Sequence, residues 1–278
     1  MSALSNKSWR DLRRRPGRAI STIATIAFAV AGLWIFAMPV LMTDAMNHRI
    51  ATDRVYDVRL TTTDVVLDPE QLAELRAVPG VVALEARTVY NTTLVAGDRR
   101  RDVLLVGVPD WSDQDVDAVV VDEGKAPVGD EVVTDRMNAL TGRYSGGLGA
   151  NISVEDGAGH ARPLVVAGRG DTLAFSQLAA QEQAVLYAPQ TTANSLAHAS
   201  GVDSIEFRVR DPQLASGVAT EVRAHLLEMK PDVTFPILSM CANPAHGPVR
   251  RSSPTSRRCS TWGRRSRSSQ RSCSSRTR

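Results

Sequence analysis

The chain has 278 residues and a net charge of +3 at pH 7, which three regions carry very unevenly. Residues 1–19 hold six basic side chains and one acidic one (+5), residues 241–278 hold ten Arg and no acid, and residues 20–240 carry −12. An acidic central region argues against a nucleic-acid surface. All three cysteines lie after residue 240, at spacings that indicate neither a zinc site nor a disulfide framework.

The first element in chain order is an apolar run from Ile20 to Met42, 23 residues without a charged side chain. A bilayer core of about 30 Å needs roughly 20 helical residues, and the apolar part of a secretory signal has only roughly 7–15. We therefore expect a transmembrane helix over residues 20–42, with Pro39 tolerated near its end. A cleaved signal and a buried core helix are the alternatives.

The charge around this helix predicts its orientation. Positively charged flanks stay in the cytoplasm, so the basic segment, residues 1–19, is expected inside the cell. The chain after Met42 is then extracytoplasmic, and the protein is expected in the plasma membrane with a single pass. About 200 residues remain before the composition changes near residue 240, which is enough for one ordinary domain or two small lobes.

Short strands and a few helices are predicted over these 200 residues, which indicates the α+β class. Alternating or continuous apolar residues predict strands at 54–62, 81–97, 101–108, 183–189, 204–210 and 233–238, and a hairpin at 151–168. Helices are predicted at 68–80 and 211–232, where Asp68 and Asp211 act as caps, and a strand that runs into a short helix at 130–142.

The order of these elements resembles a known family. The stretches "WRDLRRRPGRA", "LRAVPGVVALEA", "RDVLLVGVPDW" and "GDEVVTDRMNAL" are similar, in this order, to FtsX-like (MacB-type) permeases of ABC transporters. The resemblance covers residues 8–238. It implies that residues 43–240 form a mixed, mostly antiparallel, two-lobed extracytoplasmic core domain of the MacB type.

The same resemblance implies a function and partners. The chain is expected to be the membrane subunit of an ABC transporter of the export or lipoprotein-release type. Its partners would be an ATP-binding subunit and a second permease copy, with membrane lipid around residues 20–42 and no nucleic acid. ATP hydrolysis would belong to the separate subunit, so the chain itself is not expected to be an enzyme.

The chain departs from this family after residue 240. The family continues into three more membrane helices, whereas residues 250–278 contain ten Arg and ten Ser. If the codons from Ser260 are read one nucleotide earlier, Ser (TCN) becomes Phe, Leu, Ile or Val, and Arg (CGN) becomes Ala, Thr, Ser or Pro. The run "LYVGAALALISALVLISNT" then results, the outline of a membrane helix. We interpret residues 241–278 as a disordered frameshift product of a truncated permease; the alternative is a complete, anchored binding or sensor protein.

No motif predicts a catalytic, cofactor-binding or metal-binding residue. The glycine-rich stretch 142–151 lacks the Gly-Lys-Ser/Thr ending of a phosphate-binding loop and reads as a flexible loop. Asp113, Asp115 and Asp117 have the spacing of calcium ligands, but Ala118 and Gly124 occupy the positions that need Gly and Glu, which predicts a solvated acidic loop.

The remaining polar candidates are isolated. Ser176 and Ser204 lack the glycine context of a nucleophile, and Asn91 fits a glycosylation acceptor but lies in a predicted strand. The five histidines are scattered without a metal-binding spacing: His48, His160, His198, His225 and His246.

Overall fold

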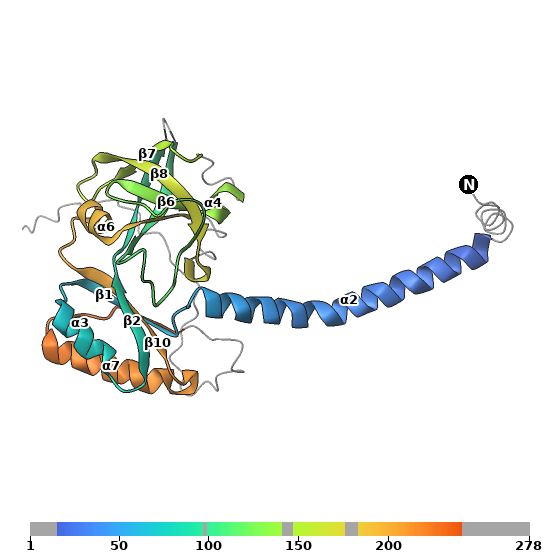
Figure 1. Cartoon of the computed structure of the whole chain (residues 1–278), viewed down its shortest axis with the longest axis horizontal. Coiled ribbons are helices and arrows are strands. Elements are labelled where there is room, and N and C mark those ends of the chain that lie inside the picture. The colour runs from blue at the N-terminus through green and yellow to red at the C-terminus, as the bar shows by residue number, and fades with distance from the viewer. Residues whose placement is uncertain (1–15, 97–98, 141–146, 176–182, 241–278) are drawn as a thin grey trace, which may run out of the picture. The chain divides into compact units, whose positions relative to one another are not determined.

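The computed structural model of the chain describes residues 16–96, 99–140, 147–175 and 183–240, all within one unit, Met1–Pro248 (Figure 1). The predicted tail 241–278, residues 97–98, most of the basic segment 1–19 and half of the glycine-rich stretch 142–151 lie outside the described residues.

The apolar run is helical, but the helix does not end with it. Helix α2, Pro16–Thr52, passes Pro39 and continues ten residues beyond Met42, so the predicted boundary at residue 43 falls inside a helix. Within the described residues, α2 is the one helix long and apolar enough to cross a membrane, and none of its apolar window is buried. Side chains of this kind need lipid or other helices around them.

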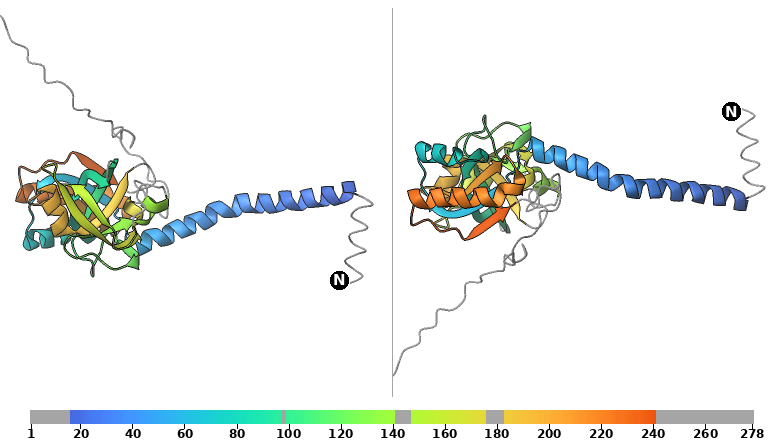
Figure 2. Two further views of the ribbon diagram at one scale, coloured as in Figure 1. Left: turned by 90° about the horizontal axis from the view of Figure 1, so that it is seen from above. Right: turned by 90° about the horizontal axis from the view of Figure 1, so that it is seen from below.

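A four-stranded antiparallel sheet follows, with the strand order β11-β1-β10-β2. Its strands are β1 (Val58–Val65), β2 (Val81–Arg87), β10 (Val202–Val209) and β11 (Ile237–Met240). Helices α3 (Pro69–Arg76) and α7 (Ala215–Met229) cover one face, as both Figure 1 and Figure 2 show. A 3₁₀ turn, η1 (Pro212–Leu214), precedes α7.

The core of this sheet lies on the helical face. Leu60, Ile205 and Phe207 from the strands pack with Leu75 of α3 and Val222 of α7, all fully or almost fully buried. Burial of such side chains contributes roughly 1.5–3 kcal/mol each, so this layer is a hydrophobic core of its own. The opposite face carries charged side chains.

The second sheet has seven strands in the order β5-β8-β6-β9-β4-β3-β7, and β7 also pairs with β8. Six strands, all except β5, therefore close into a barrel. The strands are β3 (Val89–Ala96), β4 (Arg99–Val108), β5 (Val120–Gly124), β6 (Glu131–Asp135), β7 (Asn151–Glu155), β8 (Ala161–Asp171) and β9 (Ala184–Pro189). Only the pairs β4–β9 and β6–β8 are parallel.

The barrel has its own apolar interior. Leu105, Leu164 and Leu186 point into it, and Ala193 and Leu196 of helix α6 (Gln190–Ala197) pack against the same cluster. A second apolar cluster around Tyr187, Phe175 and Val106 lies on the outer side of these strands, with the short helix α4 (Arg136–Leu140) beside it.

The α+β class, the apolar N-terminal helix and the mostly antiparallel mixed sheets are confirmed. The predicted strand 81–97 is divided at Thr88, because β2 belongs to the four-stranded sheet and β3 to the barrel. Strand β5 and helix α6 were not predicted. The barrel is inserted in the chain between β2 and β10, two neighbours in the four-stranded sheet.

Candidate functional site

Arg49, in the last turns of α2, holds the end of the helix against the barrel. Its guanidinium pairs with Asp53 (Nε–Oδ2 2.9 Å) and with Asp171 at the end of β8 (Nη2–Oδ1 2.8 Å). Asp53 is fully buried and also accepts a hydrogen bond from the Leu173 N–H (2.8 Å). Arg136 of α4 binds the other oxygen of Asp171 at 2.9 Å. Charge-assisted hydrogen bonds of this kind are about twice as strong as neutral ones.

A buried hydroxyl–carboxyl pair lies next to this contact. The Tyr187 hydroxyl donates to Asp135 (2.7 Å), and both side chains are buried. Burial raises the pKa of Asp135 to about 6, although the hydrogen bond from Tyr187 opposes the shift. Burial also raises the pKa of Asp53, against the hydrogen bond from Leu173 and the charge of Arg49.

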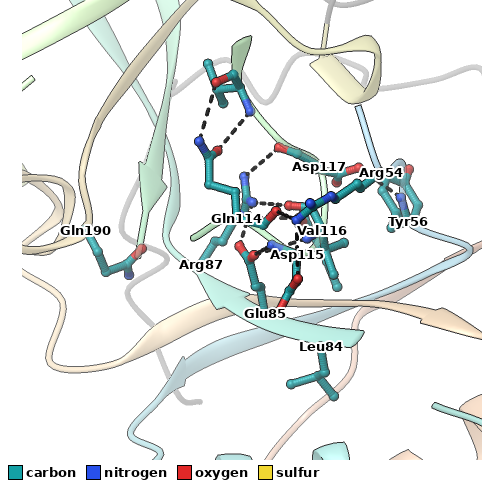
Figure 3. Close-up of polar contacts among 12 residues, drawn as sticks. Arg54, Tyr56, Leu84, Glu85, Arg87, Gln114, Asp115, Val116, Asp117 and Gln190 are labelled. Atoms are coloured by element: carbon teal, nitrogen blue, oxygen red, sulfur yellow. Dashed lines mark hydrogen bonds and ion pairs between the residues drawn. The ribbon is translucent and has the colours of Figure 1, made fainter. Parts of the chain in front are cut away.

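The loop between β4 and β5, residues 109–119, is the second segment in contact with the helix end; we call it the bridging loop. The N–H groups of Asp117 and Ala118 donate to the carbonyls of Arg54 (2.9 Å) and Asp53 (2.7 Å). The Arg54 guanidinium in turn donates to the carbonyl of Gln114. Two segments distant in the sequence are thus joined by backbone hydrogen bonds just after α2. Figure 3 shows Arg54 beside Gln114, Asp115 and Asp117 of the bridging loop.

The charged face of the four-stranded sheet lies under the bridging loop. Arg59 on β1 is paired in register with Glu206 on β10, and Glu206 with Glu85 on β2. Like charges directly opposite each other destabilise a sheet, so the two glutamates need cations beside them. Arg59 supplies one, with Nε 2.6 Å from Glu206 Oε1.

Arg59 also contacts three further segments. Its guanidinium carbon lies 4.2 Å from the ring centroid of Tyr56 and 4.6 Å from that of Phe175. Its Nη2 lies 3.4 Å from Asp117 Oδ2. A cation between two aromatic faces gains about 0.5–2 kcal/mol per ring, more when desolvated. Arg59 therefore joins β1 to β10, to the bridging loop, to the linker after α2 and to the segment after β8.

Arg87, at the end of β2, is the second cation and is fully buried. Its Nη2 lies 2.6 Å from Glu85 Oε2 and donates to the Val116 carbonyl, and its Nη1 donates to the Asp117 carbonyl at 3.3 Å. Glu85 accepts from the N–H groups of Asp115 (2.5 Å) and Val116 (3.1 Å). Figure 3 shows Arg87 and Glu85 directed at the bridging loop. The loop is thereby fixed to the four-stranded sheet.

The two innermost carboxyl groups have opposite pKa shifts. Burial, with the nearby charge of Glu206, raises the pKa of Asp117 well above its ordinary value. Burial alone would raise the pKa of Glu206 too, but Arg59 and Arg87 together hold it below its ordinary value.

A second polar contact joins the two sheets where the chain passes between them. The Thr88 hydroxyl bonds to Asn194 of α6, and the Val89 N–H donates to Asp203 (2.7 Å). The Gly201 N–H donates to Asp64 at 2.6 Å. Burial raises the pKa of Asp203 to about 6.

The structure brings few of the sequence candidates together. Asp113 and Asp115 are exposed, as the prediction of a solvated acidic loop requires. The prediction is wrong for Asp117, which is fully buried because the positive charges of Arg59 and Arg87 lie beside it. Ser204 is buried and donates to Glu206 (3.1 Å), which is a structural role.

The other candidates are scattered. His160 and His198 both lie beside Asp156, at 3.7 and 3.3 Å, and Asn91 is exposed in β3 and bonds to Gln183. Ser176 and His246 lie outside the described residues. Over the described ranges, no group of three or more His, Cys, Asp or Glu side chains is arranged to hold a metal ion.

We call the contacts of the bridging loop with the end of α2 and with the charged face of the four-stranded sheet the junction. The sequence analysis did not predict the residues of the sheet that form it. Arg59, Glu85, Arg87 and Glu206 occupy alternate strand positions, which are normally solvent-facing. The sequence does contain one signal of this cluster. On three strands, charged residues of opposite sign (Arg59, Glu85 and Glu206) stand between buried apolar residues.

No family model matches the chain, and no curated protein matches it. Solved structures similar to it include the following two. One is the extracellular domain of the noncanonic ABC-type transporter YknZ from Gram-positive bacteria (TM-score 0.44, 13% identity, covering 66% of this chain and 99% of that one). The other is the periplasmic region of MacB from Actinobacillus actinomycetemcomitans (TM-score 0.44, 13% identity, covering 69% of this chain and 91% of that one).

Proposed function

We propose that the chain is the membrane subunit of an ABC transporter whose outer domain receives motion from α2 through the buried junction. One observation carries this proposal. Helix α2 runs without a break from the apolar segment to Arg49, where it contacts the end of β8 and, just beyond, the bridging loop. Because the helix is continuous, a shift of its membrane part is passed to the contacts that its end makes with both sheets.

In this proposal, residues 1–19 are cytoplasmic, residues 20–42 cross the plasma membrane, and residues 43–240 form the extracytoplasmic core domain. ATP hydrolysis belongs to a separate ATP-binding subunit, and two permease copies form the membrane part. The family resemblance supports export or lipoprotein release as the direction of transport.

The proposal includes the tail. Residues 241–278 are an out-of-frame translation of a segment that would supply further membrane helices. The apolar reading of the codons from Ser260 supports this, because it begins where the family places its second membrane helix. The nucleotide sequence tests it directly: an apolar frame that stays open beyond codon 278 is expected, and stop codons early in that frame would contradict it.

Topology is tested by cysteine labelling in intact cells. The three native cysteines are replaced by Ser, and Ser5→Cys and Val128→Cys are made separately; Val128 is 73% exposed. A membrane-impermeant maleimide is expected to label Val128→Cys in intact cells and Ser5→Cys only after lysis. Labelling of Ser5→Cys in intact cells, or release of the domain into the medium, would overturn the orientation.

The transport role is tested with a frame-restored chain in membranes. It is expected to capture an ATP-binding subunit, and ATP is expected to change the fluorescence of a dye at residue 128. Arg49→Gln should weaken the fluorescence response and leave subunit capture intact. The matched control is Arg100→Gln, because Arg100 is 69% exposed and pairs with Glu155 of β7, outside the contacts of the bridging loop. Failure to capture any ATP-binding subunit would favour an anchored binding or sensor protein instead.

A further inference from the structure

The junction contains a buried cluster whose formal charges do not balance. It consists of five side chains that lie within hydrogen-bonding or ion-pair distance of one another: Arg59, Glu85, Arg87, Asp117 and Glu206. The exposure of these side chains is 16% for Arg59, 7% for Glu85 and 0% for the other three. Three carboxylates and two guanidiniums leave one negative charge in excess. An uncompensated buried charge costs several kcal/mol.

Among the described residues, no ion pair brings a third cation to the cluster. Arg54, which contacts the bridging loop, is 46% exposed and pairs with Asp115, which is itself 62% exposed. The other groups that face the cluster come from three segments and are neutral or acidic: Tyr56 of the linker, Phe175 after β8, and Ser204 and Asp203 of β10. Asp203 lies close enough to Glu206 for the two charges to repel each other.

The geometry indicates where a proton can restore the balance. The carboxyl groups of Asp117 and Glu206 share one guanidinium: Arg59 Nη2 lies 3.4 Å from Asp117 Oδ2, and Arg59 Nε lies 2.6 Å from Glu206 Oε1. A proton on one of the two acids removes the repulsion between two buried anions. Glu206 is the better anion, because Arg59 Nε lies 2.6 Å from it, Arg87 Nε lies 3.6 Å away, and Ser204 donates to it. The guanidinium nitrogen paired with the Asp117 carboxyl group is Arg59 Nη2, at the longer distance of 3.4 Å.

We propose that Asp117 carries a proton which it donates to Glu206, and that loss of this proton releases the bridging loop from the junction. With both groups ionised, two buried carboxylates would face each other across Arg59. The Asp117 N–H and the neighbouring Ala118 N–H are the groups that hold the loop to Arg54 and Asp53. The junction is therefore closed when the proton is bound, and it responds to the pH of the compartment around the outer domain.

This inference goes beyond the proposed function and does not depend on it. The protonation state of Asp117 can be measured on the full chain in detergent, whether or not the chain is part of a transporter. Failure of one proposal leaves the other standing.

The first experiment detects the proton by infrared spectroscopy at pH 8. Asp135 and Asp203, with pKa values of about 6, are ionised there and give no protonated-carboxyl band. The native chain is expected to show such a band, and Asp117→Asn to lack it. If Asp117→Asn does not fold, Glu206→Gln is used: its amide donates to Asp117, so the band is lost again. Identical spectra for the native chain and the variant that folds would overturn the proposal.

The second experiment follows hydrogen exchange of the Asp117 and Ala118 amides, corrected for the intrinsic pH dependence of exchange. If opening releases one proton, protection falls about tenfold per pH unit between the pKa of Asp117 in the opened loop and its higher pKa in the closed junction. Asp117→Asn should keep both amides protected across the same range, and Asp115→Asn, two residues away and exposed, should behave like the native chain. Protection in the native chain that does not change with pH would contradict the release step.

Discussion

Arg87 is the residue whose removal should disturb the junction most. Its guanidinium is fully buried, and it compensates Glu85 and Glu206 while it donates to two carbonyls of the bridging loop. Arg87→Met should lower the free energy of unfolding by about 3–5 kcal/mol, because two buried glutamates lose their shared cation. Urea unfolding measures the loss.

The matched control for this prediction is Arg100→Met. Arg100 is similar in chemistry but is 69% exposed in its pair with Glu155, and surface pairs contribute about 0–1 kcal/mol. Equal losses for the two variants would show that the buried ion pairs do not stabilise the junction.

Asp203 should give the stability a specific pH dependence. Its pKa is about 6 in the folded chain against an ordinary value of 3.8. Between these values the folded chain retains a proton that the unfolded chain has released, so this group's contribution to stability falls as the pH rises from about 4 to about 6. Above the higher value the contribution is constant.

The measurement is the difference in free energy of unfolding between the native chain and Asp203→Asn, taken from urea titrations at several pH values. The native chain should lose stability relative to the variant over this interval. Asn can still accept the Val89 N–H, so the fold should be kept. A difference that is flat, or that changes in the opposite direction, would contradict the assignment.

At the scale of elements, the start of α3 is determined by its sequence alone. Asp68 accepts from the Gln71 N–H (2.8 Å), and the Gln71 side chain accepts from the Asp68 N–H (3.2 Å), a capping box. Asp68→Ala should therefore cost about 1 kcal/mol of stability, measured by thermal unfolding. Glu74→Ala, in the same helix and exposed, should cost less than half as much; a larger effect at Glu74 would contradict the capping explanation.

Local patterns allow the elements to be predicted, but not the way in which they pair. Alternation and caps were sufficient for β1, α3 and the β7–β8 hairpin, since these depend on adjacent residues. The division of the stretch 81–97 at Thr88 and the closure of the barrel depend on pairing with strands far along the chain, such as β10 and β7. The burial of Asp117 also depends on residues distant in the sequence, Arg59 and Arg87. The sequence of the acidic loop alone therefore does not predict that Asp117 is buried.

At the scale of the whole molecule, residues 43–240 should fold without the membrane segment. Each sheet has its own apolar core, and the fragment retains Arg49 and Asp53. Circular dichroism should show a cooperative unfolding transition. A second fragment, residues 54–240, lacks both side chains and should be less stable. A non-cooperative transition for the longer fragment would rule out an independent domain.

The insertion of the barrel between β2 and β10 affects how the protein is made. A ribosome delivers the last barrel strand, β9, at Pro189, but the four-stranded sheet needs β11, which ends at Met240. At a synthesis rate of about 5–20 residues per second, β10 is complete on the order of ten seconds after β2. The barrel should therefore fold first on the nascent chain. Meanwhile the apolar faces of β1 and β2 stay uncovered, and they are the segments that a holding chaperone would bind during synthesis.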